Sequence, residues 1–513
     1  MNTPEERHFS LVILNCHFEN NIVNNPTTNA ATGGAIHFAS SDVWNGDGFL
    51  IIFNSSFVNN QAIGRPSTGV ARGSAIYAFD TYFRLRDSKF HSNSTNARER
   101  SHGGTIALWG NMGGVGVTGN PIDTAEISRC EFIGNETEGA SGTSGIVFFQ
   151  LASQSENAKL LINRCSFAGN GLGTTSGPVI YAGKELESGT STSTSGTLTI
   201  TNSLFTDNEG LVASALMAGD EVDITLTHCT IAANRHNPNW GAAVFMATAS
   251  SSISLDRSVV ALNDHLGGAQ IAALSPDIFA TSSAEVESFG YNFLGSGTGL
   301  NAGIFQTSDQ HGSNSERLDP LLAAFDDYGN GMMIMPPLAG GPLTERIPGP
   351  YGLVDPFRLD LTGVQRSWNM VDIGAVQLSR INYDNWANAS GLPTGDDRLP
   401  DTDYSGDGLS NRMSYFLGLN PLVFNPNPIR VFPDSENLFL EFVRSSQAGF
   451  DHTASNGLSE WLLEYSDDLE TWSPFPAEPE LLITESGASD YVSYRYSVDA
   501  SESTHRFFRL RVE

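Results

Sequence analysis

The sequence predicts an all-β protein whose larger part is a right-handed parallel β-helix, a solenoid in which coils of short strands stack on one another. Three observations predict this fold class. An apolar, mostly aromatic residue recurs along the chain, an asparagine follows it at a fixed distance, and Gly-led apolar stretches lie between these pairs.

The aromatic position recurs eight times, with asparagine three residues after it and Cys or Ser two residues before it. The aromatic position is filled by Phe18, Phe57, Phe90, Phe132, Phe167, Phe205, Ile231 and Val260. The asparagine position is filled by Asn21, Asn60, Asn93, Asn135, Asn170, Asn208, Asn234 and Asn263. The preceding position is filled by Cys16, Ser55, Ser88, Cys130, Cys165, Ser203, Cys229 and Ser258. Such a recurrence is typical of a solenoid.

Each repeat contains stretches in which apolar and polar residues alternate, as in residues 198–208. Alternation with period two indicates a strand with one buried face. A Gly-led strand follows downstream, as at residues 33–36 and 241–244. One coil cannot bury its apolar face alone, so coils must stack. Parallel crossovers favour the right-handed sense.

Stacking predicts columns of like residues. The rings are expected to form an internal stack, which adds about 0.5–1.5 kcal/mol per contact beyond burial. The asparagines are expected to form a ladder between coils, because each amide both donates and accepts hydrogen bonds.

The composition excludes several function classes. The net charge is −30 and only three lysines occur, which argues against nucleic acid and anionic membranes as partners. No apolar run reaches the roughly 18 residues that a membrane-spanning helix needs. The first ten residues are polar and do not form a signal peptide. We expect a secreted or outer-surface protein that is a monomer and whose natural N-terminus and capping element lie upstream of this chain.

We predict that the four cysteines are reduced, buried, small residues. Serine replaces cysteine freely in their repeat position. Cys130 and Cys165 fall on adjacent coils, but parallel stacking would hold their Cβ atoms near 4.8 Å, beyond the roughly 3.8 Å of a disulfide.

Changes of pattern divide the chain into four segments. The solenoid repeats occupy residues 1–290, and residues 291–380 lose the repeat. In that second segment Asp360 and Arg366 are expected to form a buried structural pair. Residues 381–425 predict a short helix, a loop and a second helix. Residues 426–513 alternate again and predict a small β-sandwich.

The loop in residues 381–425 predicts a calcium site. Oxygen ligands alternate along DYSGDGLSN, and Gly408 supplies the sharp turn. The predicted ligands are Asp403, Ser405, Asp407, the Leu409 carbonyl and Asn411. Ser414 occupies the place of the usual last acidic ligand, which Asp401, Asp396 or Asp397 could replace. The alternative is a metal-free Asp/Gly turn that caps the following helix.

These motifs resemble known families. The FxxN and GGxI repeats of residues 11–274 resemble those of chlamydial polymorphic outer-membrane proteins and other bacterial β-helix surface proteins. Residues 290–292, 319–321 and 372–375, with Asp360, Gly363 and Arg366, resemble the choice-of-anchor Q module. That resemblance implies that residues 291–380 close the solenoid. The loop around Asp403 resembles dockerin-like and thrombospondin-type-3-like calcium loops.

The sequence favours a non-enzymatic surface protein that serves adhesion or contacts an extracellular polysaccharide or cell-surface component. No catalytic residues can be assigned. The first alternative is a polysaccharide lyase or glycoside hydrolase acting on acidic polysaccharide, and the second is a structural spacer or passenger. A hydrolase needs two carboxylates roughly 5–9.5 Å apart. Arg84 and Arg86 share an outward face near Asp87, but we expect no second acid in register with them.

Three tryptophans lie in or near the predicted loops, namely Trp44, Trp109 and Trp240. An exposed row of them would suit sugar stacking, and the alternative is that they anchor the loops on the solenoid.

Overall fold

The computed structural model describes two compact units, Met1–Pro337 with Gly341–Gln377, and Leu338–Gly340 with Leu378–Glu513. The described residues are 10–25, 30–39, 48–64, 69–79, 81–97, 100–109, 124–138, 145–150, 158–171, 177–183, 196–236, 241–248, 250–266, 277–280, 285–328, 332–338, 341–348, 359–364, 366, 370–377, 387, 390–393, 395–417, 419, 421–424, 429–434, 437–445, 461–466, 473–474, 480–482, 491–499 and 507–512.

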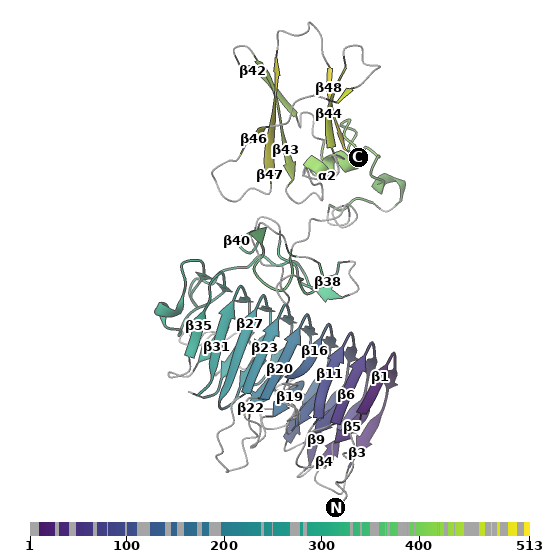
Figure 1. The fold of residues 1–513 in the computed structure, drawn as a ribbon, viewed down its shortest axis with the longest axis vertical. Coiled ribbons are helices and arrows are strands. Elements are labelled where there is room, and N and C mark those ends of the chain that lie inside the picture. The colour runs from purple at the N-terminus through teal and green to yellow at the C-terminus, as the bar shows by residue number, and fades with distance from the viewer. Residues whose placement is uncertain are drawn as a thin grey trace, which may run out of the picture. The chain divides into compact units, whose positions relative to one another are not determined.

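The first unit is a parallel β-solenoid built on three long sheets (Figure 1). Sheet 1 contains β1 (Ser10–Leu14), β6 (Gly48–Phe53), β11 (Thr81–Arg86), β16 (Thr124–Ser128), β20 (Ala158–Asn163), β23 (Gly196–Thr201), β27 (Val222–Thr227), β31 (Ser252–Asp256) and β35 (Glu285–Ser288). Sheet 2 contains β2 (His17–Glu19), β7 (Ser56–Val58), β12 (Lys89–His91), β17 (Glu131–Ile133), β21 (Ser166–Ala168), β24 (Leu204–Thr206), β28 (Thr230–Ala232), β32 (Val259–Ala261), β36 (Phe293–Leu294) and β37 (Gln310–His311). Sheet 3 contains β5 (Ile36–Ala39), β10 (Ile76–Phe79), β15 (Ile106–Trp109), β19 (Val147–Gln150), β22 (Ile180–Gly183), β26 (Ala213–Ala218), β30 (Ala242–Met246) and β34 (Ile278–Ala280).

Shorter parallel sheets complete the coils. They contain β3 (Ile22–Asn24), β8 (Gln61–Ile63), β13 (Ser94–Asn96) and β18 (Glu136–Glu138); β4 (Ala30–Thr32), β9 (Val70–Arg72) and β14 (Arg100–His102); and β25 (Glu209–Gly210), β29 (Arg235–His236) and β33 (Asp264–His265). The prediction of a parallel solenoid is confirmed, and its right-handed sense stays a prediction.

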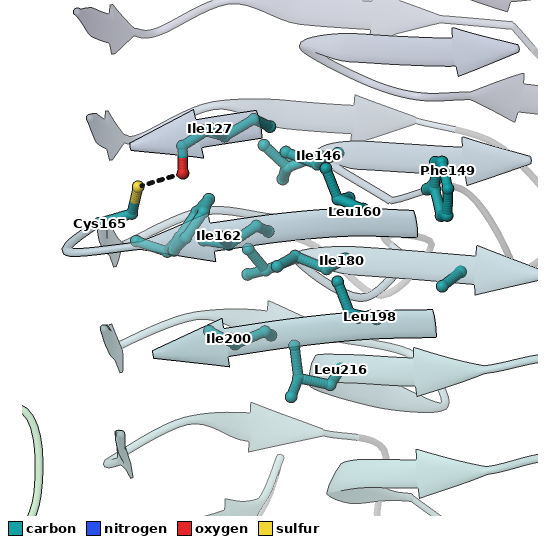
Figure 2. Close-up of a cluster of buried hydrophobic side chains, with 14 of the residues drawn as sticks. Ile127, Ile146, Phe149, Leu160, Ile162, Cys165, Ile180, Leu198, Ile200 and Leu216 are labelled. Carbon is teal, nitrogen blue, oxygen red and sulfur yellow. Dashed lines mark hydrogen bonds between the residues drawn. The ribbon is translucent and has the colours of Figure 1, made fainter. Parts of the chain in front are cut away.

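The predicted aromatic column lies inside the solenoid. Adjacent rings from Phe18 to Phe205 are nearly parallel, with centroids 4.7–4.8 Å apart. Ile231 and Val260 continue the register of Phe205. Figure 2 shows the neighbouring aliphatic core, in which Ile162 and Leu198 come from adjacent strands of sheet 1 and Leu216 comes from sheet 3.

The asparagine ladder is also confirmed. The Oδ1 of Asn170 accepts hydrogen bonds from the backbone and side-chain nitrogens of Asn135, at 3.0 Å each. The Nδ2 of Asn170 donates to the Phe132 carbonyl at 3.0 Å and to Asn208 Oδ1 at 2.9 Å. Each amide therefore satisfies buried backbone groups at a turn, which explains why only asparagine recurs there.

The Cys or Ser position has a similar role. The Ser88 hydroxyl accepts the Ser55 backbone N–H and donates to the Arg86 carbonyl. Cys165 Sγ lies 3.6 Å from the Ile127 carbonyl, as Figure 2 shows. All four cysteines are free, as predicted. The prediction of burial is confirmed for Cys130, Cys165 and Cys229 and is wrong for Cys16, which is exposed on the first coil. Burial raises the pKa of the Cys229 thiol to about 12.

Described residues between 318 and 377 form a segment, here called the strap, that lies along the outer face of sheet 2. Its elements include β38 (Asp326–Asp327), β39 (Met333–Ile334), β40 (Ile347–Pro348) and β41 (Met370–Val371), and the 3-10 helix η1 (Ala302–Ile304) precedes it. Leu204 packs against Ile334 and Leu361, and Val259 lies in a second cluster with strap residues. The chain after the repeats therefore turns back beside the coils, from β32 past β21, where the Ser166 hydroxyl donates to the Met333 carbonyl, as far as β17, where the Met333 backbone bonds to Glu131.

Asp360 and Arg366 are both buried in the strap, as expected, but they bind different groups. The Asp360 carboxylate accepts from Thr362, Val364 and Gln377. Arg366 donates to Asn202 Oδ1 and to the Gly374 and Ala375 carbonyls. Their attraction acts through space, and burial lowers the pKa of Arg366 to about 10.

The second unit contains two small antiparallel sheets, one of β42 (Ile429–Asp434), β43 (Asn437–Ser445), β47 (Tyr491–Asp499) and β46 (Glu480–Leu482), the other of β45 (Ser473–Pro474), β44 (Trp461–Ser466) and β48 (Phe507–Val512). It also contains the 3-10 helix η2 (Asp396–Arg398) and the helix α2 (Asn411–Leu417). The packing of these sheets as a sandwich stays a prediction. In the part of the chain that is described, no helix is long and apolar enough to cross a membrane.

Candidate binding face

The outer face of sheet 1 presents polar side chains in register across successive coils. Outward positions carry hydroxyl groups on three adjacent strands, where Thr199 pairs with Thr225 and Thr225 with Ser254. A parallel column combines Thr197, Asp223 and Ser252. Threonine suits these positions because its branched side chain favours a pleated strand while its hydroxyl reaches solvent. The six residues form a flat polar surface, here called the hydroxyl face.

Some groups in and beside this face are already satisfied within the protein. The Thr201 hydroxyl donates to Asn163 Oδ1 at 2.9 Å, and the Ser252 hydroxyl donates to Asp223 Oδ1 at 2.6 Å. Thr201 and Thr227 are buried, whereas Thr199, Thr225 and Ser254 are partly exposed. The column of Thr199, Thr225 and Ser254 is therefore the part of the face best placed to contact a ligand.

A charged cluster lies on the same sheet at β11 and β16. Arg86 donates two hydrogen bonds to the Glu126 carboxylate, at 2.9 and 2.7 Å, and Arg84 Nε lies 3.1 Å from it. Burial, the largest single effect, opposes ionisation of Glu126. The hydrogen bonds and charge of Arg86, with smaller contributions from Ser128 and Arg84, together outweigh burial and hold the pKa of Glu126 below its ordinary value. Glu126 is therefore a fixed anion and is unsuited to act as a general acid.

Our expectation that no acid lies in register with Arg84 and Arg86 was wrong, because Glu126 pairs with Arg84 across the two strands. The signal was present in the sequence, since each residue lies six positions before its aromatic anchor. Asp87, the acid that we did note, forms an ion pair with Arg129 on the next coil. Both carboxylates are thus held by arginines.

Asp256 lies at the C-terminal side of the hydroxyl face, next to Thr227 in register. Burial raises the pKa of this carboxyl, and its ion pair with Arg257 offsets burial only in part. A raised pKa is useful in an acid catalyst, but a hydrolase needs a second carboxylate at a defined separation. Glu287 pairs in register with Ser254, so a second, exposed carboxylate lies on the strand next to Asp256.

Trp109 is not an exposed loop residue. It ends β15, stacks on Phe148 with centroids 5.7 Å apart, and lies beneath the Arg72 guanidinium at 4.0 Å. For this residue the structure favours an anchoring role on the solenoid. Trp44 and Trp240 lie outside the described residues.

The predicted calcium loop belongs to the second unit. Asp403 Oδ1 accepts the Gly406 and Asp407 backbone N–H groups at 2.8 and 3.3 Å, and Oδ2 accepts that of Gly408 at 2.7 Å. Gly406 and Gly408 have φ of 72° and 88°, which favours glycine. The loop is thus closed around Asp403, immediately before α2.

The fit of this loop to a cation depends on neutral ligands. In the described part of the chain, no three His, Cys, Asp or Glu side chains are placed to hold a metal together. Asn411 is buried and its Nδ2 donates to the Asp397 and Leu399 carbonyls. Asp401 is largely exposed and lies 3.4 Å from Arg412. Calcium would therefore need Asp403 and Asp407 together with the Ser405, Leu409 and Asn411 oxygens, and this site stays a prediction.

Comparison of this chain with protein-family models, with curated proteins and with solved structures yields no match. The family resemblances drawn from the motifs therefore stay predictions.

Proposed function

We propose that this chain is a non-catalytic protein of the cell exterior that binds polysaccharide through the hydroxyl face. The observation that carries the proposal is the in-register column Thr199, Thr225 and Ser254, with its neighbours Thr197, Asp223 and Ser252. Strands about 4.8 Å apart repeat these groups at a regular spacing. A regular array of donors and acceptors matches a ligand that repeats its own hydroxyl groups.

The net charge of −30 favours a neutral polysaccharide over an acidic one. The carboxylates on this side of sheet 1 support binding over catalysis, because Glu126, Asp87 and Asp256 are each held by an arginine. Attachment at a cell surface fits a long rigid solenoid followed by a second folded unit. We also propose that the solenoid is right-handed, that the two C-terminal sheets pack as a sandwich, and that the chain is related to bacterial β-helix surface proteins.

The test is a glycan array and a pull-down on insoluble neutral polysaccharides with the full chain. A variant carrying Thr199→Val, Thr225→Val and Ser254→Ala keeps strand-forming side chains and removes the central hydroxyls. We expect it to lose at least about tenfold in affinity, since hydroxyl donors and acceptors contribute roughly 0.5–1.5 kcal/mol each. Ser94→Ala with Thr32→Val, on other sheets, is the control and should bind normally. Binding that the triple variant retains in full, or no glycan bound by the wild type, would rule the proposal out.

We also propose that calcium orders the loop around Asp403. Two carboxylates and neutral oxygens predict weak affinity, about 10⁻⁴–10⁻³ M, as in extracellular modules. Asp403 and Asp407 would supply the charge, and the cation would tie the loop to the start of α2.

A further inference from the structure

The strand β35 extends the hydroxyl face by one coil. Glu287 of this strand pairs in register with Ser254 and has an exposed side chain. Phe289 follows two residues later, and 59% of its surface is exposed. The Phe289 backbone N–H donates to the Leu255 carbonyl at 2.8 Å, which keeps this residue beside β31. The column of hydroxyl groups therefore leads to an exposed carboxylate and an exposed aromatic ring.

The charge on this part of sheet 1 is negative. The strands β23, β27, β31 and β35 contain four acidic residues but no Lys or Arg. Asp223 and Glu287 are both exposed, and neither forms an ion pair with another described residue. Asp256, by contrast, is held by Arg257. Asp223 and Glu287 lie two strands apart, about 9.6 Å along the solenoid axis, so they are two separate anionic points.

The cations of sheet 1 lie on earlier coils. Lys159 of β20 pairs in register with Thr197, and Arg84 and Arg86 of β11 contact Glu126. The outer face of the sheet is therefore polarised along the solenoid axis, with its unpaired carboxylates towards β35. A ligand that covers β23 to β35 meets these carboxylates, so charge complementarity favours positive groups on it.

The chemistry of the face restricts the ligand further. An ammonium group has three N–H donors and no acceptor, which suits the carboxylates of Asp223 and Glu287. The hydroxyls of Thr225 and Ser254 both donate and accept, which suits the hydroxyl groups of a sugar. The ring of Phe289 offers an apolar surface on which a sugar ring can stack. A sugar with a free amino group satisfies all three requirements.

We propose that the polysaccharide bound by the hydroxyl face carries free amino groups. This inference rests on the proposed function and narrows its non-acidic ligand to a polymer of amino sugars. The polymer lies along the solenoid axis, places ammonium groups at Asp223 and Glu287, and stacks one sugar ring on Phe289.

The experiment titrates the full chain with a glucosamine hexasaccharide and with its N-acetylated counterpart, at a pH where the free amines are protonated. We expect the amino form to bind at least about threefold more tightly at low ionic strength, since exposed ion pairs contribute modestly. The difference should vanish at about 1 M salt, where the Debye length is about 3 Å. Asp223→Asn with Glu287→Gln should abolish the preference and leave binding of the N-acetylated form unchanged. Phe289→Ala should weaken binding of both forms by about two- to tenfold.

Glu136→Gln with Glu138→Gln is the matched control, because it removes two exposed carboxylates from β18, in a different sheet. We expect this control to keep the preference for the amino form. Equal binding of the two oligosaccharides by the wild type would overturn the inference. An equal loss of preference in the control would also overturn it, because the attraction would then come from the net charge of the whole chain.

These results are distinct from a failure of the proposed function. Binding of a neutral polysaccharide that depends on the hydroxyls of Thr199, Thr225 and Ser254 would stand even if the amino preference is absent. If the wild type binds neither hexasaccharide, the inference is overturned, and the proposed function fails with it only when the glycan array also shows no ligand.

Discussion

Asn170→Ala tests the ladder at its centre. The substitution removes four buried hydrogen bonds, two accepted from Asn135 and two donated to Phe132 and Asn208. Two backbone groups lose their side-chain partner, the N–H of Asn135 and the carbonyl of Phe132. A buried polar group left unpaired costs about 1–3 kcal/mol, so we expect the solenoid to lose about 2–6 kcal/mol in free energy of unfolding.

The assay is urea denaturation followed by hydrogen exchange of the solenoid amides, which separates this unit from the C-terminal one. Asn96→Ala is the matched control, because Asn96 is exposed and its side-chain amide donates to Glu138 on the surface. We expect that control to change the free energy of unfolding by less than about 0.5 kcal/mol. The reasoning fails if Asn170→Ala is as mild as Asn96→Ala, or if exchange at Asn135 does not accelerate.

Four further outcomes follow. Phe132→Ala, which breaks the ring column, should cost about 3–5 kcal/mol in calorimetry. Burial raises the pKa of Asp277 to about 7 from 3.8, so the folded state holds a proton that the unfolded chain releases. Its contribution to stability is complete below about pH 4 and is lost as pH rises to 7, which lowers the free energy of unfolding by a few kcal/mol over that range. Denaturation measured against pH should show this slope in the wild type, and Asp277→Asn should remove it. Leu204→Ser should loosen the strap and cost about 2–3 kcal/mol, whereas Lys89→Ser at the equivalent uncovered position should be neutral in the same melts. Calorimetric titration should show calcium binding that Asp403→Asn removes, and no heat with the wild-type chain would exclude the site.

The architecture could be predicted because a fixed spacing of residues within each repeat defines how the coils align. An aromatic residue with asparagine three positions later fixes both the inward side chain and the turn, so Phe57, Phe90 and Phe132 could be placed in one column before any coordinates. The Cys or Ser position was predicted as a small buried slot, and its hydrogen bond across coils explains why both residues serve.

The strap could not be placed from its own residues, because it has no repeat and its contacts are with distant strands. A signal did exist in sheet 2, where the outward residue changes from Lys89 to Leu204.

The Arg84 and Glu126 pair was missed for another reason. Arg84 was compared with residues nearby in sequence, such as Asp87, although stacking brings together residues one coil apart.

The chemistry of the outer faces was harder to predict than the core. Core positions are set by burial, which acts alike on every coil, whereas outward positions depend on what covers them. Val12 and Thr199 occupy the same column on different coils, and the sequence predicts both as outward-facing strand residues. Only their surroundings separate an apolar stretch from the polar hydroxyl face.

Distances between spin labels along one outward column test the central claim most directly. One register column of sheet 1 contains Val12, Ile51, Glu126 and Ser254, with Arg84 between Ile51 and Glu126 and with Leu161, Thr199 and Thr225 between Glu126 and Ser254. The native cysteines are first replaced by serine, which their position accepts. With one label at Ser254, a partner at Glu126, Ile51 or Val12 should lie about 19, 29 or 34 Å away, a rise of about 4.8 Å per coil. Distances that do not increase in this order and in these steps would contradict the stacked register.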